Sequence, residues 1–264
     1  MDPAAPGAEI ARPRPAATVL LVRDGAEGLE VFMVVRHHQI DFASGALVFP
    51  GGSLDKDDHV IAADSARCGA AMATLDEAAR AFRIGAVRET FEESGVLLAR
   101  PRGSTTLVSG ERVEAIAKRA GERKFSEWLA EEDLELALDL LTPFAHWVTP
   151  TALPKRFDTH FFIAAAPADQ LAVHDGSEGV DSVWINPARG LADAKAGKYT
   201  MVFATRLNVE MLGRENDVAA AIEAARVRKI VTVMPDAQPR ADGGKGFTLR
   251  IPLEAGYGGD TYTS

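Results

Sequence analysis

The chain contains a single cysteine, Cys68, and this scarcity excludes an intramolecular disulfide. A lone thiol fits a reducing compartment, so we expect a cytoplasmic location. No apolar run approaches the roughly 18 residues that a membrane-spanning helix needs. Basic residues are also in deficit, because 29 Lys and Arg stand against 38 Asp and Glu, for a net charge of -9. A general nucleic-acid-binding protein would show a basic face. We therefore expect neither nucleic acid nor a membrane as a partner.

The rest of the composition is ordinary for a soluble globular protein, with 47% hydrophobic and 25% charged residues. A chain of 264 residues can bury a large core and fits one enzyme-sized unit. Residues 1–16 are rich in Pro and Ala and lack an apolar signal core, which predicts a disordered lead-in. The final Tyr262-Thr263-Ser264 does not match a peroxisomal Ser-Lys-Leu address.

The most informative stretch is Arg88-Glu89-Thr90-Phe91-Glu92-Glu93-Ser94-Gly95-Val96. Its spacing places Glu89, Glu92 and Glu93 on one face of a helix. Like charges at this spacing destabilise a helix by about 0.2–0.5 kcal/mol per pair, so their presence together indicates a use for negative charge. The simplest use is a hard divalent cation such as Mg²⁺, which prefers oxygen ligands and is commonly shared with phosphates. A solvated acidic face is the alternative reading of the helix alone.

The helix itself is predicted from its pattern. Thr74 opens a capping-box pattern and is the expected N-cap. Ile84, Val87 and Phe91 form an apolar stripe that points away from the glutamates. Gly95 suits the left-handed position that commonly ends a helix. One side of this helix should therefore pack into a core while the other presents carboxylates.

A glycine turn lies upstream of the helix. Leu47 to Gly52 reads as a short apolar strand that ends in a Pro-Gly-Gly turn. The adjacent Gly51 and Gly52 let the backbone approach a ligand closely and expose carbonyls that can coordinate a metal. A glycine turn combined with a carboxylate helix indicates a metal site much more strongly than either feature alone.

Together these residues resemble a known family. Gly51-Gly52 followed by Arg88-Glu89-x-x-Glu92-Glu93-x-Gly95-Val96 is similar to the signature of Nudix hydrolases. The resemblance implies cleavage of a nucleoside diphosphate linked to another group, with Mg²⁺ or Mn²⁺ held on the signature helix. It also implies one Nudix domain over residues 17–255, with insertions near 53–75 and 110–140, and a tail over 256–264.

The signature shows one departure. The family places another glutamate at a fixed position before the arginine, and counting back from Arg88 puts Arg80 there. Four acids lie nearby, but none is in register: Asp55, Asp57, Asp58 and Glu77. An insertion after Gly52 explains the shift and resembles the peroxisomal coenzyme A diphosphatase subfamily. That resemblance extends to residues 81–89, 147–150 and 156–162.

The resemblance implies roles for individual residues. Glu89, Glu92 and Glu93 would hold the metal, with help from the main chain near Gly51 and Gly52. Arg88 is expected to hold a signature carboxylate in place, and a surface ion pair with Glu92 is the alternative. In some members the general base lies on a later loop, where Glu178 stands in this chain.

Substrate contacts are predicted from residue type. Arg36 follows a strand, and Lys155 and Arg156 lie in a proline-rich turn, so each could reach a phosphate. Phe42, Trp147 and Phe203 could stack on a base, although core packing is the default. The substrate is left open between coenzyme A or acyl-coenzyme A and another compound such as ADP-ribose, NADH or a nucleotide sugar. A non-enzymatic nucleotide sensor and a homodimer are also left open.

The remaining pattern predicts an α+β fold of the Nudix α/β/α type, with a mixed sheet between helical layers. Expected strands cover residues 18–22, 30–35, 46–49, 96–98, 144–148, 157–165 and 180–185, with a closing pair at 229–234 and 246–251. Expected helices cover 62–73, 187–195, 205–226 and two segments within 110–139.

Overall fold

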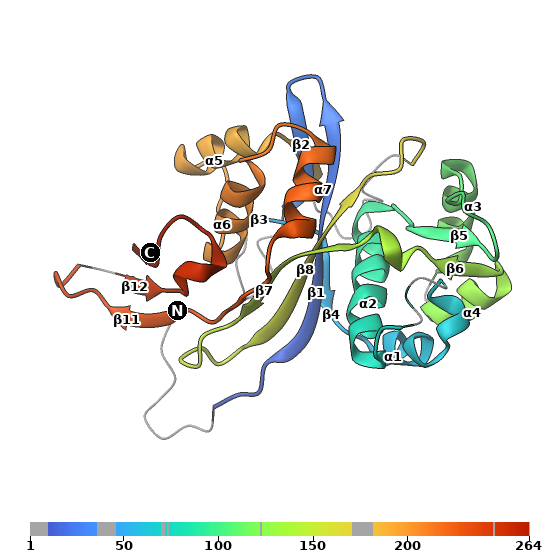
Figure 1. The fold of residues 1–264 in the computed structure, drawn as a ribbon, viewed down its shortest axis with the longest axis horizontal. Helices are drawn as coiled ribbons and strands as arrows, with labels where there is room; N and C mark the ends of the chain where they lie inside the picture. Colours follow the sequence, from blue (N-terminus) through green and yellow to red (C-terminus); the bar gives the residue numbers. More distant parts are fainter. Residues whose placement is uncertain are drawn as a thin grey trace.

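A mixed β-sheet lies between two layers of helices, which confirms the predicted fold class (Figure 1). Its strand order is β10-β7-β8-β1-β2-β3, with β4 added beside β1 and β9 beside β2. The strands are β1 (Arg14–Gly25), β2 (Gly28–Val35), β3 (Leu47–Val48), β4 (Gly51–Ser53), β7 (Thr142–Val148), β8 (Phe157–Ala165), β9 (Ser182–Ile185) and β10 (Thr232–Val233). Strands β1 and β8 run parallel at the centre, while β1 and β2 form an antiparallel hairpin.

This computed structural model describes residues 10–35, 46–69, 72, 74–121, 123–170, 182–244 and 246–263. In the described part of the chain, no helix combines the length and the apolar character that crossing a membrane requires.

Each face of the sheet has its own helical cover (Figure 1). One face carries α1 (Lys56–Ala63), α2 (Glu77–Ser94), α3 (Gly110–Ala120) and α4 (Phe125–Glu131), together with the small pair β5 (Ala99–Pro101) and β6 (Leu134–Leu136). The other face carries α5 (Pro187–Lys195), α6 (Phe203–Leu212) and α7 (Val218–Val227), together with β11 (Asp236–Pro239), β12 (Phe247–Arg250) and β13 (Thr261–Thr263). Short 3-10 turns are η1 (Ser65–Arg67), η3 (Leu138–Leu140) and η4 (Leu253–Ala255).

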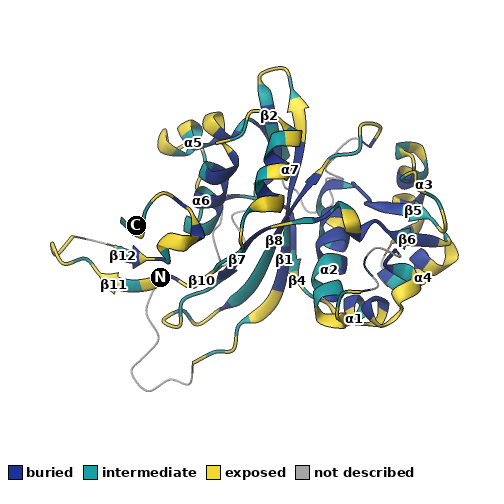
Figure 2. Cartoon of the chain, in the orientation of Figure 1, coloured by how far each residue is buried: buried dark blue, intermediate teal, exposed yellow. Residues whose placement is uncertain are grey.

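The alternation of side chains along β8 creates two cores. Phe162 and Ala164 join the core under α2, whereas Phe161 and Ile163 join the core under α6 and α7. Successive side chains of a strand point to opposite faces, so an apolar run on a central strand serves both layers. Figure 2 shows the corresponding burial of the central strands and of the inner helix faces.

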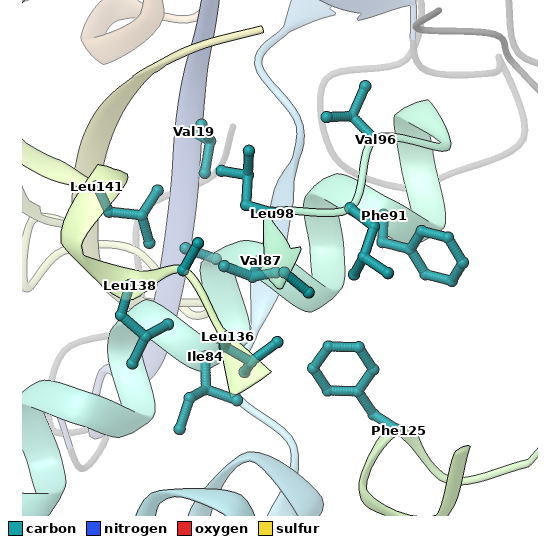
Figure 3. Packing of buried hydrophobic residues seen from close by; sticks show 14 of the residues in the cluster. Val19, Ile84, Val87, Phe91, Val96, Leu98, Phe125, Leu136, Leu138 and Leu141 are labelled. Carbon is teal, nitrogen blue, oxygen red and sulfur yellow. The ribbon is translucent and has the colours of Figure 1, made fainter. Parts of the chain in front are cut away.

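Helix α2 carries the predicted apolar stripe. Ile84 and Val87 are fully buried, and Phe91 is buried with them. Figure 3 shows these three residues in the same packed cluster as Leu98 and Leu136. Burying each such side chain contributes about 1.5–3 kcal/mol relative to leaving it exposed. The stripe therefore fixes how the helix is rotated and which residues it turns away from the core.

The ends of α2 match the prediction only in part. Gly95 has a left-handed backbone with φ of 70°, and its N–H donates to the Phe91 carbonyl at 2.9 Å, as expected. The predicted N-cap Thr74 is wrong, because the helix begins after Asp76. The Asp76 carboxylate accepts the Ala79 N–H at 2.7 Å, and Asp is among the strongest N-cap residues.

Three other elements differ from the pattern-based prediction. The helix expected at 62–73 lies earlier, at α1, because Asp55 and Asp58 form a capping box that starts it. The helix expected at 205–226 is divided into α6 and α7 around Gly213. The closing strands do not pair with each other, since β10 joins β7 and β12 joins β11.

Regular structure extends into both segments that were predicted to lie outside the domain. Strand β1 already begins at Arg14, inside the predicted lead-in of residues 1–16. The predicted tail over 256–264 contains β13, which pairs with β12.

One predicted strand is absent within the described part of the chain. Residues 96–98 are irregular backbone that leads into β5.

Candidate active site

The two glycines of the Pro-Gly-Gly turn lie beside the carboxylates of α2. Gly51 and Gly52 belong to β4, which pairs antiparallel with β1. The Gly51 N–H donates to Glu93 Oε2 at 2.9 Å. A Cβ atom on Gly52 would lie 2.5 Å from Glu89 Oε2, closer than non-bonded atoms tolerate. A side chain at position 52 would therefore require the Glu89 carboxylate to move.

Arg88 is the centre of this cluster. Its Nε and Nη2 donate to the two oxygens of Asp58, each at 2.9 Å, in a bidentate fork. Its Nη1 donates to Glu89 Oε1 at 2.8 Å and to Glu92 Oε2 at 3.0 Å, and Nη2 also donates to the Ser53 carbonyl at 3.0 Å. All five N–H donors of the guanidinium are thus in use. Arg88 ties α1, α2 and β4 together and holds two of the three glutamates.

Among the four acids named near Gly52, Asp58 is the one that contacts Arg88. Its side chain is fully buried, and besides Arg88 it accepts the Asp55 N–H at 2.8 Å. Counting back from Arg88 led to Arg80, but Arg80 donates to the Ala62 carbonyl at 2.8 Å and serves the packing of α1 on α2. The sequence signal for Asp58 was its position six residues after Gly52, counted forward from the turn instead of back from the helix.

The electrostatics of the cluster favour a cation. Burial raises the pKa of Glu89 to about 6, although Arg88 acts in the opposite direction. Burial also raises the pKa of Glu92 above its usual value. Burial alone would lower the pKa of Arg88, but the hydrogen bonds and charges of Asp58 and the glutamates raise it. Arg88 contacts only one oxygen of Glu89 and one of Glu92. The other oxygen of each carboxylate could therefore still coordinate a metal ion.

A large apolar cavity adjoins the glycine turn. Its volume is about 540 Å³, and Gly51 and Gly52 form part of its wall. Aromatic residues line it from three strands, one helix and one loop: Phe49, Trp147, Phe157, Phe161, Phe203 and Phe247. Cavities of about 300–1,000 Å³ with mostly apolar walls are typical of small-molecule sites. Gly51 and Gly52 thus contact the carboxylates of α2 and also form part of the cavity wall.

The predicted substrate residues have different fates. Trp147 and Phe203 line the cavity and pack edge-to-face with ring centroids 5.8 Å apart. Lys155 is exposed in the loop between β7 and β8, where Ala152 and Leu153 reach the cavity wall. Arg36, Phe42 and Glu178 lie outside the described residues.

Arg156 has a structural environment. It is buried, and its guanidinium donates to the Thr149 carbonyl at 3.0 Å and the Ala11 carbonyl at 2.8 Å. These bonds fasten the start of the chain to the β7–β8 loop. Its predicted contact with a phosphate stays a prediction, and these bonds give no support to it.

Comparison with known proteins decides the family. The family model described as the NUDT19 Nudix domain matches residues 60–202, more than half of the chain. The chain belongs to the Nudix hydrolases. The matched residues include the whole of α2 with its arginine and glutamates.

Individual relatives agree with this Nudix assignment. A putative Nudix hydrolase 7 of Caenorhabditis elegans is 31% identical over 191 residues, covering 71% of this chain and 56% of the relative. The acyl-coenzyme A diphosphatase NUDT19 of Xenopus laevis is 26% identical over 217 residues, covering 64% and 56%. The chain therefore spans just over half the length of these curated relatives. A crystal structure of a Nudix hydrolase from Alicyclobacillus acidocaldarius has a TM-score of 0.64 and 28% identity, covering 81% of this chain and 97% of that one.

Proposed function

We propose that this Nudix chain is a metal-dependent diphosphatase that cleaves coenzyme A or an acyl-coenzyme A to 3',5'-ADP and (acyl-)phosphopantetheine. The observation that carries the proposal is the position of the carboxylate cluster beside an apolar cavity of about 540 Å³. A diphosphate ester with a bulky group on each side needs both features. The relatives named acyl-coenzyme A diphosphatases in Xenopus laevis and Homo sapiens support this substrate class.

The chain offers a suitable ligand set for Mg²⁺ or Mn²⁺. Glu89, Glu92 and Glu93 would hold the ion, with help from the main chain near Gly51 and Gly52. Their fit is supported by the raised pKa values of Glu89 and Glu92. Burial disfavours the charged form of each carboxylate, and a bound cation would stabilise that form. When bound, such an ion neutralises phosphate charge and acidifies a water for attack on phosphorus.

Other residues have supporting roles in the proposal. Arg88 is a positioning residue, because its donors are used by Asp58, Glu89, Glu92 and Ser53. Lys155 is exposed beside the cavity wall and would pair with a phosphate of the substrate. Glu178, outside the described residues, would serve as the general base. A cytoplasmic location and a homodimer stay predictions.

The test is hydrolysis of coenzyme A, ADP-ribose and NADH with Mg²⁺ or Mn²⁺, comparing wild type with Glu92→Gln and Glu93→Gln. Glu77→Gln is the matched control, since Glu77 is an exposed acid on the same helix. We expect both signature variants to lose about 100-fold or more in kcat, the scale of a lost electrostatic stabiliser. The control should keep its activity.

Each contrary result removes a defined part of the proposal. Unchanged activity in Glu92→Gln and Glu93→Gln would refute the metal assignment. Cleavage of ADP-ribose or NADH with coenzyme A left intact would refute the substrate class. Wild-type protein that binds these compounds but turns over none of them would identify a nucleotide sensor.

A further inference from the structure

A second cluster of metal-ligating side chains lies on the sheet, apart from the glutamates. His146 on β7 and Asp158 and His160 on β8 each offer one ligand atom, and these atoms lie within 4.8 Å of one another. The register explains the cluster, because His146 pairs directly with His160 across the antiparallel β7–β8 ladder. Asp158 lies two residues before His160 and so has its side chain on the same face.

The cluster is distinct from the glutamate site. His160 pairs with Ala17 of β1, and Ala17 pairs with Gly52 of β4, next to Glu89. Strands are about 4.8 Å apart, so roughly 10 Å of sheet separates His160 from Gly52. His146, Asp158 and His160 lie on the α2 side of the sheet, behind the wall where Trp147 and Thr159 face the cavity.

The orientation of His146 is fixed by its neighbours. Its Nδ1 lies 2.8 Å from the Thr232 hydroxyl of β10, and its Nε2 lies 2.5 Å from Asp158 Oδ1. Because the carboxylate can only accept, Nε2 donates its proton to Asp158 in the metal-free protein. An ion bound at Nε2 would displace that proton, and Nδ1–H would then donate to the Thr232 hydroxyl. Metal-bound histidines typically donate their second N–H in this way, which fixes the tautomer and the ring.

His160 is held by stacking. Its ring lies 3.9 Å from the Phe82 ring of α2 and 4.2 Å from the His146 ring, measured between centroids. The cluster stays open to solvent, since the His146 side chain is 19% exposed and that of Asp158 is 36% exposed. An ion could therefore reach ligands that are already held in place.

We propose that His146, Asp158 and His160 form a site for a divalent transition metal such as Zn²⁺ that is independent of the Mg²⁺ or Mn²⁺ site. Two imidazoles and one carboxylate are typical ligands of Zn²⁺ and related ions, whereas Mg²⁺ prefers oxygen. Zn–N distances of about 2.0–2.1 Å put neighbouring ligands about 3.3 Å apart, which small side-chain rotations achieve from the present spacing. Bound there, the ion would join β7 and β8 directly and β10 through Thr232.

The experiment uses the metal-stripped full chain with excess Mg²⁺ present to saturate the glutamates. Co²⁺ is followed by its visible d–d absorption and Zn²⁺ by calorimetry. We expect a single equivalent of either ion to bind and Zn²⁺ to raise the unfolding temperature. Asp158→Asn and His146→Gln should weaken binding at least about tenfold, and Thr232→Val about tenfold through the lost bond to His146.

Matched variants separate this site from others. His59→Gln, which alters an exposed histidine on α1, should keep full binding, and so should Glu92→Gln. Circular dichroism of each variant without metal checks that it is folded. Binding that Glu92→Gln abolishes, or that survives both His146→Gln and Asp158→Asn, would overturn the proposal. No Co²⁺ or Zn²⁺ binding at all would show that His146, Asp158 and Thr232 form a hydrogen-bond network only.

Discussion

Arg88 shows how one side chain can join several elements around a carboxylate cluster. Its planar fork suits bidentate binding to Asp58, and a lysine could not replace all five of its donors. Asp58 is fully buried, so its charge is tolerable only with this partner. The same guanidinium holds Glu89 and Glu92 at 2.8 and 3.0 Å. The core of the protein and the candidate metal ligands therefore share a single anchor.

The raised pKa of Glu89 predicts a pH dependence of stability in the metal-free protein. Burial shifts this pKa from 4.5 to about 6, so the folded state holds a proton that the unfolded state has released between these values. The contribution of Glu89 to stability must then fall as pH rises through this window. We expect Glu89→Gln, which cannot titrate, to gain about 1–2 kcal/mol on the wild type between pH 4.5 and 7.

The measurement is urea unfolding in EDTA at several pH values, reported as the difference between variant and wild type. Glu77→Gln is the control, because Glu77 is exposed in the first turn of α2. Its removal should change the free energy of unfolding by only about 0.5 kcal/mol. A difference for Glu89→Gln that stays constant across the window would contradict the prediction.

At the scale of elements, sequence reasoning succeeded where periodicity was strong. The stripe of α2, its glycine end and the strands β7 and β8 all match their predicted positions closely. It failed where a local polar contact decided the structure. Asp76 displaced Thr74 as the cap, and the Asp55–Asp58 box started α1 early. Since Asp58 sits in α1 against Arg88, we propose that the inserted residues lie between Asp58 and Arg88 instead of starting at Ser53.

In the segment after α2, a contact that is distant in the sequence decides the backbone conformation. Residues 96–98 have the apolar composition of a strand. The Leu97 backbone bonds to the side chain of Gln170 instead of to a neighbouring strand. Gln170 accepts the Leu97 N–H at 2.8 Å and donates to the carbonyls of Leu97 at 3.2 Å and Val108 at 2.8 Å. No local pattern announces a partner 73 residues away.

Loss of this amide should destabilise the protein measurably. Gln170→Ala leaves the Leu97 N–H and the carbonyls of Leu97 and Val108 without this partner, although the Leu97 carbonyl still accepts the Ala99 N–H at 3.0 Å. Each group left unsatisfied costs about 1–3 kcal/mol, and water offsets part of the loss. We expect a net loss of about 2–4 kcal/mol in urea unfolding. Gln238→Ala is the matched control, since Gln238 is exposed on β11 and should lose less than about 0.5 kcal/mol. Equal losses in the two variants would show that Gln170 does not anchor the segment.

At the scale of the whole molecule, the sheet separates two tasks. The face under α2 builds the carboxylate cluster, while the opposite face opens into the cavity. The cavity could not be predicted, because its wall joins residues from β4, β7, α6 and the distant β12. Trp147 illustrates the difficulty: its ring lines the cavity while its N–H donates to Tyr257 at 2.8 Å, so it serves packing and site together.

Filling the cavity should separate substrate binding from the chemical step. Ala204 of α6 lines the cavity, and Ala204→Trp would occupy part of its 540 Å³ without touching the carboxylates. If the cavity holds a group that the substrate carries on one side of the diphosphate, KM for coenzyme A should rise about tenfold with kcat within about twofold, the mark of lost uniform binding. Ala219→Trp on the exposed side of α7 is the matched control and should leave both constants unchanged. Circular dichroism checks that Ala204→Trp is folded. An unchanged KM in the folded variant would place the substrate elsewhere. A fall in kcat alone would mean that the cavity supports the geometry of the glutamates and does not bind the substrate.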